Sequence, residues 1–276
     1  MQREGIQTMA ITGGKGGVGK TVVAVSMATA LAQAGNRVLL LDGDTGLASV
    51  DVQLGLTPRY TLEHLLSGER SLEDLLLQTR EGVSVVPAAS GIARMAALGP
   101  REHATLVHAF ATLPRNFDVL IIDCAPGIAE QVRRFSEAAQ HLVVVLCDEP
   151  ASLTDAYALI KVLMRERNLR RFKILVNKSQ PGDGEALFKR LQRVTDRYLE
   201  VDLQYLGEVP EDRAVLKAVR EQRSVLSAYP GSPAAHALRR IAVQSRRWPV
   251  PTTGGRIEFF IEHMYSAPQR RLRVVK

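Results

Sequence analysis

The feature that most constrains the fold is a glycine-rich loop near the start of the chain. A short apolar run at residues 9–11 leads into Gly-Gly-Lys-Gly-Gly-Val-Gly-Lys-Thr at residues 13–21. The loop contains the pattern G-x-x-x-x-G-K-[ST], in which backbone N–H groups wrap a phosphate chain, the lysine reaches the outer phosphates and the hydroxyl ligates Mg²⁺. The sequence therefore predicts a nucleotide-phosphate site formed by Gly14, Gly16, Gly17, Val18, Gly19, Lys20 and Thr21.

The apolar patterning around this loop predicts an α/β fold. Strand-like runs recur at residues 6–12, 37–41, 83–86, 119–122, 142–146, 173–176 and 205–209. Helical patterns lie between most of them, at residues 22–34, 102–113, 129–139, 153–167 and 186–199. Apolar strands that alternate with amphipathic helices predict a doubly wound, mostly parallel sheet covered on both faces. Ligands of such sheets bind at the carboxyl ends of the strands, where the loop and its following helix would lie.

We expect one domain over residues 1–250, followed by a C-terminal segment over residues 251–276. A chain of 276 residues can bury a large core. Residues 1–238 carry 27 basic and 27 acidic side chains, whereas residues 239–276 carry 9 basic and 2 acidic ones. The whole net charge of +7 therefore lies at the C-terminal end, which argues against a protein whose entire surface coats nucleic acid.

The C-terminal segment has the apolar spacing of an amphipathic helix. Its apolar residues at i, i+3, i+4, i+7 and i+8 are Ile257, Phe260, Ile261, Met264 and Tyr265, and basic residues follow. Such a helix either packs on its own domain or binds anionic lipid at a membrane surface, and the sequence leaves both readings open. Without a signal peptide or a membrane-spanning run, we expect a cytoplasmic protein whose membrane contact, if any, is peripheral through residues 257–276.

Two further strands end in carboxylates. Asp42 and Asp44 follow the apolar run at residues 37–41, and Asp123 closes the run at residues 119–122. A single acid at the end of an apolar strand is the Walker B arrangement. We therefore expect Asp123 to hold Mg²⁺, through a water.

The remaining reactive side chains predict structure rather than chemistry. Cys124 and Cys147 are too few for a disulfide framework, so we expect two buried thiols. The six histidines have no metal-ligand spacing and are expected at the surface or as polar residues of helices. Trp248 beside Pro249 is expected to pin the end of the domain to its body.

The loop carries a second lysine, Lys15, which a plain phosphate loop does not require. The sequence K-G-G-V-G-K-T resembles the deviant Walker A motif of the MinD/ParA/nitrogenase-iron-protein class. The resemblance implies that Lys15 crosses the interface of an ATP-dependent homodimer and delivers charge to the partner's nucleotide as the γ-phosphate leaves. A shared iron–sulfur cluster is not expected, because Cys124 has the wrong placement for its ligands.

The resemblance also assigns the carboxylates after the second strand. Asp44 would position and polarise the attacking water, and Asp42 would support the magnesium shell with Thr21 and Asp123. The segment at residues 124–127 resembles switch II, in which the N–H of Gly127 would sense the γ-phosphate. Lys15, Lys20, Asp44 and Asp123 are thus the expected catalytic residues.

We infer the base-binding residues from their positions in the chain relative to these motifs. Asn177, after the strand-like run at residues 173–176, would offer a donor and an acceptor to the adenine edge. Pro210, Glu211 and Asp212 would contact the base through their backbone, with their side chains left free. The implied cofactors are ATP, ADP and Mg²⁺.

Longer stretches resemble the flagellar-number regulators of this class, FleN or FlhG. They include residues 47–58, 86–91, 147–161 and 257–262, and the similarity runs from about residue 6 to residue 263. The resemblance implies a slow ATPase switch, which dimerises around ATP and then restrains a FleQ-like flagellar transcription activator of the AAA+ type. A FlhF-like GTPase is a further partner of the class. Residues 1–7 lack its stimulating D-Q-x-x-x-L-R-like motif, so we do not expect its activation through them.

Several positions depart from the pattern of these relatives. Gly43 stands where alanine is more frequent, Ser49 where asparagine is frequent, and Cys124 begins a different run of small residues. None of these departures removes a charged catalytic group.

Two other functions remain open from the sequence. A ParA-like partitioning or positioning ATPase would act on DNA or a membrane surface, although the neutral body makes direct nucleic-acid binding unexpected. A metabolic enzyme that transfers phosphate to a small molecule is disfavoured by Lys15, and no substrate pocket for it can be identified.

Overall fold

The computed structural model of the chain describes residues 5–44, 49–87, 100–113 and 117–250. Within these residues one eight-stranded sheet has the order β3-β4-β2-β5-β1-β6-β7-β8. Neighbouring strands are parallel except for the antiparallel pair β3 and β4. The strands are β1 (Gln7–Thr12), β2 (Val38–Gly43), β3 (Leu77–Gln78), β4 (Val83–Val86), β5 (Val119–Cys124), β6 (His141–Cys147), β7 (Arg171–Ser179) and β8 (Asp202–Pro210).

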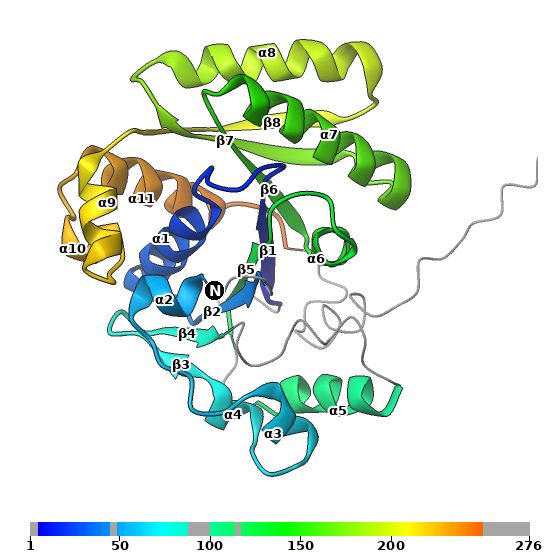
Figure 1. Cartoon of the computed structure of the whole chain (residues 1–276), viewed down its shortest axis with the longest axis vertical. Helices are drawn as coiled ribbons and strands as arrows, with labels where there is room; N and C mark the ends of the chain where they lie inside the picture. Colours follow the sequence, from blue (N-terminus) through cyan, green and yellow to red (C-terminus); the bar gives the residue numbers. More distant parts are fainter. Residues whose placement is uncertain (1–4, 45–48, 88–99, 114–116, 251–276) are drawn as a thin grey trace, which may run out of the picture.

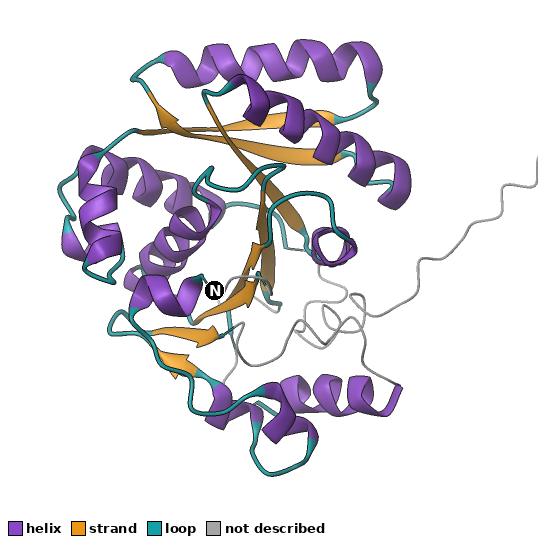
Figure 2. Cartoon of the chain, viewed as in Figure 1, coloured by secondary structure: helices purple, strands orange, loops and turns teal. Residues whose placement is uncertain are grey.

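Helices cover both faces of this sheet (Figure 1). On one face lie α1 (Lys20–Gln33), α2 (Val50–Leu54), α9 (Arg213–Arg220), α10 (Val225–Ala228) and α11 (Pro233–Ser245). On the other face lie α3 (Leu62–Leu66), α4 (Leu72–Leu75), α5 (Pro100–Ala111), α6 (Glu130–Ala138), α7 (Pro150–Arg167) and α8 (Asp183–Tyr198). Figure 2 shows the strands enclosed between these helices. The predicted doubly wound α/β fold is therefore confirmed.

The period-two geometry of the strands divides the core into two clusters. Met9 and Ile11 of β1 pack on the α1 face, whereas Ala10 between them packs on the opposite face. Because both faces are covered, the strands have continuous apolar sequences. Helix α1 is apolar nearly all round because it lies between the sheet and α11, and residues 23–31 are all buried.

The topology brings the predicted motifs to one edge of the sheet. Strand β1 pairs with β5 on one side and with β6 on the other, so the chain moves outward from β1 in both directions. A reversal of this kind leaves a crevice beyond the carboxyl ends of the central strands. The loops that follow β1, β2, β5, β6 and β7 meet at this edge.

The end of the described chain is fastened at the opposite edge by a group of residues that we call the C-terminal clamp: Gln7, His141, Lys173 and Trp248. Gln7 Nε2 donates to the carbonyls of Ser245 and Trp248, and Lys173 Nζ lies 4.4 Å from the centre of the Trp248 ring. The prediction for Trp248 is confirmed. The prediction for histidines is wrong for His141, which is buried in β6, packs edge-on against Trp248 and shares a 3.0 Å hydrogen bond with the Pro249 carbonyl.

Both cysteines are buried free thiols, as expected. Among the described helices, none combines the length and apolar character that crossing a lipid bilayer requires. The amphipathic pattern at residues 257–265 lies outside the described residues, so the domain boundary at residue 250 stays a prediction.

Candidate functional site

The phosphate-binding loop joins the carboxyl end of β1 to the first turn of α1. Gly17 and Gly19 have φ angles of 80° and 90°, which side chains other than glycine rarely adopt. A Cβ atom on Gly14 would lie 2.2 Å from the carbonyl of Asp155 in α7, whereas one on Gly16 would meet nothing within 4 Å. The loop is therefore packed against the domain on one side and open on the other. The first turn of α1 has no acidic residue, so its positive N-terminus remains available to an anion.

Lys20 lies under this loop rather than in solvent. Lys20 is only 7% exposed, and burial lowers the pKa of its ammonium group below the usual value. The negative charges of Asp123 and Asp44 partly oppose that shift. A buried cation close to two carboxylates, at the start of a helix, is suited to binding the outer phosphates of a nucleotide.

Thr21, Ser49 and Asp123 form a polar chain beside the loop. The Thr21 hydroxyl donates to Ser49 Oγ at 3.3 Å, and Ser49 Oγ donates to Asp123 Oδ2 at 3.2 Å. Burial raises the pKa of Asp123 to about 7, opposed by the hydrogen bond with Thr21 and by the charge of Lys20. Among the described residues, buried Asp123 Oδ1 has no hydrogen-bond partner. A hydroxyl and a carboxylate with a free oxygen fit Mg²⁺, which prefers such ligands and also keeps several waters.

Asp42, on the neighbouring strand, holds the loop that follows β2. The residue is fully buried, and its Oδ1 accepts from the Asp44 N–H while its Oδ2 accepts from the N–H groups of Ser49 and Val50. Burial raises the pKa of Asp42, and these hydrogen bonds oppose the rise. The structure thus shows Asp42 as a backbone anchor, and its support of the magnesium shell stays a prediction. Asp44 ends the described part of this loop, and its water-positioning role also stays a prediction.

Gly127 lies directly against the phosphate-binding loop. Its N–H donates to the carbonyl of Gly13 at 3.0 Å, and its φ of 89° favours glycine. In this conformation the N–H is engaged by the loop. A contact between this N–H and a γ-phosphate, as the sequence predicts, would require the bond to Gly13 to break.

Lys15 is paired within its own chain. Its Nζ lies 2.5 Å from Oε2 of Glu149, which directly precedes α7, and the two side chains are 39% and 54% exposed. This hydrogen bond raises the pKa of Lys15 and lowers the pKa of Glu149. The positive charge of Lys178 also lowers the pKa of Glu149, and Lys178 Nζ donates to the Gly17 carbonyl at 2.8 Å. One carboxylate therefore faces two lysines at the open side of the loop.

The predicted base-binding residues lie next to the loop, with one correction. Asn177 Nδ2 donates to the Val18 carbonyl at 2.8 Å, which leaves Oδ1 and a second N–H of this amide for a base. The expectation that the 210–212 side chains are free is wrong for Asp212. Its Oδ1 accepts from Ala214 N–H and caps α9, and its Oδ2 accepts from Ala234 N–H in α11. Pro210 ends β8, and the Glu211 N–H donates to the Ser179 carbonyl.

Three residues of this site were missed by the sequence reasoning: Ser49, Glu149 and Lys178. Ser49 was noted only as a departure from relatives, although a hydroxyl shortly after the two aspartates was a usable signal. Glu149 follows β6 and Lys178 lies near the end of β7, and their charges meet at the loop because these two strands are neighbours. Strand order is not visible in one sequence, so this pairing could not be found in advance.

Comparisons with known proteins agree with this geometry. Residues 9–225 match the CobQ/CobB/MinD/ParA nucleotide binding domain. The chain is 49% identical over 265 residues to the antiactivator FleN of Pseudomonas aeruginosa, covering 95% of both chains. It is 31% identical over 246 residues to the septum site-determining protein MinD of Bacillus subtilis, covering 86% of this chain and 87% of that protein. Among solved structures, the cell division ATPase MinD of Pyrococcus furiosus matches with a TM-score of 0.67 at 26% identity, over 87% of this chain and 98% of that one.

The matched domain includes the phosphate-binding loop, the two carboxylate-bearing strand ends and Asn177. The structural match extends over both faces of the sheet, because it covers most of each chain. The chain therefore belongs to the CobQ/CobB/MinD/ParA nucleotide-binding family and is a P-loop ATPase of its MinD/ParA class.

Proposed function

We propose that this ATPase is a nucleotide-operated switch that controls flagellar number. It forms a homodimer around ATP, and the dimer restrains a FleQ-like flagellar transcription activator. The observation that carries this proposal is the 49% identity to the antiactivator FleN, which extends over 95% of both chains. A second relative, the flagellum site-determining protein YlxH of Helicobacter pylori, is 28% identical over 235 residues and supports the flagellar context.

The described residues support distinct roles in such a switch. Lys20 and the N-terminus of α1 would bind the phosphates, while Thr21 and Asp123 would hold a magnesium ion, which would neutralise charge on the phosphate oxygens. Asp44 orients the attacking water and accepts its proton. Lys15 leaves Glu149 and supplies its charge to the nucleotide of the second subunit.

Loss of the γ-phosphate would be sensed by two groups, each of which has a contact within its own chain that competes with its contact to the nucleotide. The N–H of Gly127 can bond either to the Gly13 carbonyl or to the phosphate, and Lys15 can pair either with Glu149 or across the dimer. Each group therefore has an intramolecular partner that would compete with the nucleotide. Hydrolysis would return both groups to these partners and separate the subunits.

Light scattering on the full chain tests the switch directly. The wild type and Asp44→Ala are measured with ATP, with ADP and without nucleotide. We expect dimers only with ATP, and a longer-lived dimer for Asp44→Ala. Monomers under every condition would refute the dimeric switch.

The regulatory target is tested separately with a purified FleQ-like activator. We expect the ATP-trapped Asp44→Ala protein to co-migrate with the activator and to reduce its ATPase activity, and the ADP-bound wild type to do neither. ATP-dependent binding to a DNA duplex with steep salt dependence, without activator binding, would instead favour a partitioning ATPase.

A further inference from the structure

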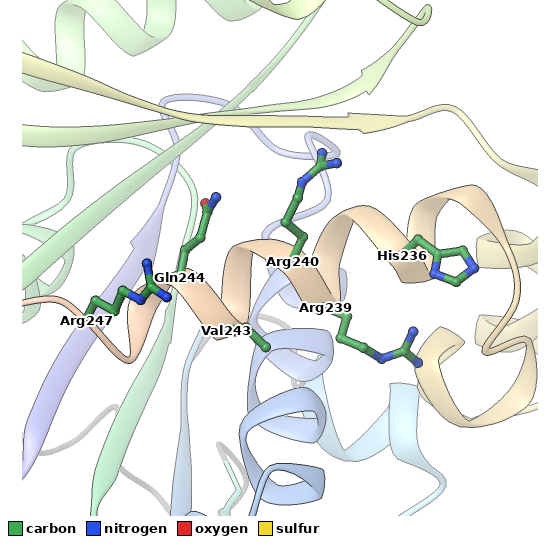
Figure 3. Close-up of a pocket in the computed structure, with 6 residues that line it drawn as sticks. All are labelled: His236, Arg239, Arg240, Val243, Gln244 and Arg247. Atoms are coloured by element: carbon green, nitrogen blue, oxygen red, sulfur yellow. The ribbon is translucent and has the colours of Figure 1, made fainter.

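Helix α11 has one buried face and one cationic face. Its buried residues, which include Leu238, Ile241 and Ala242, pack on α1 and on the sheet. The opposite face lines a shallow surface pocket of about 400 Å³ (Figure 3). The pocket residues are His236, Arg239, Arg240, Val243, Gln244 and Arg247.

The spacing of these residues makes the pocket a continuous binding surface, which we call the α11 face. The five residues from His236 to Gln244 follow i, i+3, i+4, i+7 and i+8, which on an α-helix is one stripe about 12 Å long, and Arg247 lies in the turn that follows α11. Figure 3 shows that five of the side chains come from α11 and that Arg247 comes from the turn that follows it, with Val243 between Arg239 and Arg247 along the chain. Val243 is 48% exposed, so the cationic stripe has an apolar centre.

The three guanidinium groups lack acidic partners within the described part of the chain. None of Arg239, Arg240 and Arg247 forms an ion pair with a described carboxylate, and the contact found for Arg239 is a 3.3 Å hydrogen bond to the Pro230 carbonyl. Arg133, Arg134 and Arg167 differ in this respect, because each of them forms an ion pair with at least one glutamate of α6 or α7. Among the described residues, the three arginines of the α11 face are therefore not held in ion pairs.

We propose that the α11 face binds an acidic amphipathic helix of a partner protein. Guanidinium groups form paired, charge-assisted hydrogen bonds with carboxylates, and an exposed valine between them gives an apolar side chain of the partner a place to be buried. A nucleic-acid backbone would use the arginines but gain nothing from Val243. The balanced charge of residues 1–238 also provides no wider basic surface for a duplex.

The position of this surface separates it from the nucleotide site. Helix α11 packs on α1 and follows α10, whereas the phosphate-binding loop lies beyond the N-terminus of α1 at the carboxyl edge of the sheet. None of the residues that we assign to nucleotide binding belongs to the α11 face. The inference goes beyond the proposed function, and its test does not depend on the identity of the flagellar activator.

The experiment uses the full chain and a labelled helical peptide that carries three glutamates around one leucine on a single face. Fluorescence anisotropy measures binding of this peptide, of a peptide with the same composition in scrambled order, and of a short DNA duplex. We expect the wild type to prefer the one-faced peptide. The double variant R240E/R247E should bind that peptide roughly tenfold more weakly or worse, because it replaces attraction with repulsion.

Two further variants make the outcome specific. Val243→Asn keeps the charge and has a similar helix propensity, so about threefold weaker peptide binding would report the apolar contact. The control R193E/R197E makes the same charge change on exposed residues of α8 and should bind within about twofold of wild type. Unchanged circular dichroism and ATPase activity of all variants would show that their folds are intact.

The proposal is overturned if the wild type does not distinguish the one-faced peptide from the scrambled one. It is also overturned if R193E/R197E weakens binding as much as R240E/R247E, because net charge alone would then explain the affinity. Tighter binding of the duplex, lost in R240E/R247E and unaffected by Val243→Asn, would assign the α11 face to nucleic acid.

Discussion

Lys15 and Glu149 form a 2.5 Å ion pair within one chain, between the phosphate-binding loop and the start of α7. The lysine that is proposed to act across a dimer therefore has an internal competitor. An ion pair between two exposed side chains is weak because water screens it, so the competition is modest and reversible. Its strength is suited to adjusting a dimerisation equilibrium rather than blocking it.

Glu149→Gln should favour the dimer by removing this competitor. We expect the ATP-dependent dissociation constant to fall by a few-fold, because each of the two subunits no longer has to break a weak exposed ion pair. Concentration-dependent light scattering with ATP measures the shift. Glu166→Gln, which removes a different exposed partner of an arginine, serves as the control. Weaker dimerisation of Glu149→Gln would show that Glu149 assists Lys15 instead.

Lys15→Ala should bind ATP and remain monomeric. The proposed phosphate contacts of Lys20 and of the loop backbone would persist in this variant, whereas the charge proposed to reach the second nucleotide would be lost. Fluorescent-nucleotide binding and light scattering separate the two properties. A normal dimer from Lys15→Ala would exclude a role in trans.

Asp44→Ala should lose ATP hydrolysis while retaining ATP-dependent dimers. In the proposed mechanism, nucleotide binding depends on the loop and the metal ligands, whereas orientation of the attacking water depends on Asp44. Phosphate release and light scattering test the two halves of this expectation. Unchanged turnover would remove Asp44 from the catalytic set.

The stability of the apoprotein should fall as the pH rises toward neutrality, through Asp123. Burial raises its pKa to about 7 in the folded chain, well above that of an unfolded aspartate. Between about pH 4 and 7 the folded protein therefore keeps a proton that the unfolded chain has lost, and raising the pH removes stability on the order of a few kcal/mol. Above pH 7 this loss is complete.

Asp123→Asn should abolish this pH dependence and stabilise the apoprotein at pH 8, while eliminating ATPase activity. Urea unfolding at several pH values, without magnesium or nucleotide, measures the effect. Addition of magnesium and nucleotide should stabilise the wild type more than the variant. Equal pH profiles for the two proteins would mean that Asp123 ionises normally in the fold.

The two loop glycines Gly14 and Gly16 should respond differently to alanine. Gly14→Ala places a Cβ 2.2 Å from the backbone of Asp155, so we expect a loss of stability of about 1–3 kcal/mol or a displaced loop that no longer binds nucleotide. Gly16→Ala meets open space and should unfold like wild type. Thermal unfolding measures both variants, and equal stability of Gly14→Ala and wild type would contradict the close packing of Gly14 against α7.

Asp212→Ala should destabilise the domain by about 1–2 kcal/mol, because it removes the N-terminal cap of α9 and a hydrogen bond to α11. Asp196→Ala, an exposed change in α8, should remain within about 0.5 kcal/mol of wild type. Urea unfolding measures both. Equal stability of Asp212→Ala and wild type would show that water replaces these bonds.

The sequence predicted the central fold because burial on both faces leaves long apolar runs, such as residues 119–122 of β5. The predicted strands are too short where polar residues continue the hydrogen-bonded ladder, as in β7, which extends from Arg171 to Ser179. Strand β3 and the four- or five-residue helices α2, α3, α4 and α10 were not predicted, since they are too short to establish a period. Helices α9 and α11 were not predicted either, although α11 extends over 13 residues.

The candidate site was predictable where one motif contains both the residue and its chemistry. Lys20 and Thr21 belong to the phosphate-binding loop, and Asp123 lies beside it, as their motifs require. The hydrogen bond that Asp212 accepts from Ala234 joins residues more than twenty positions apart, so a local sequence pattern cannot predict it. Pairings between distant loops, such as Lys15 with Glu149, require the strand order first.

The C-terminal clamp gives the protein an internal optical probe. Trp248 is the only tryptophan in the chain, and it lies beside His141 and Lys173 at the amino-terminal edge of the sheet. Strand β1 runs from Gln7, which bonds to the Trp248 carbonyl, to the phosphate-binding loop, about 20 Å away. Nucleotide is therefore too distant to quench this indole by contact. Any change of tryptophan emission on ATP addition would report motion transmitted through the body of the domain, read without an attached dye.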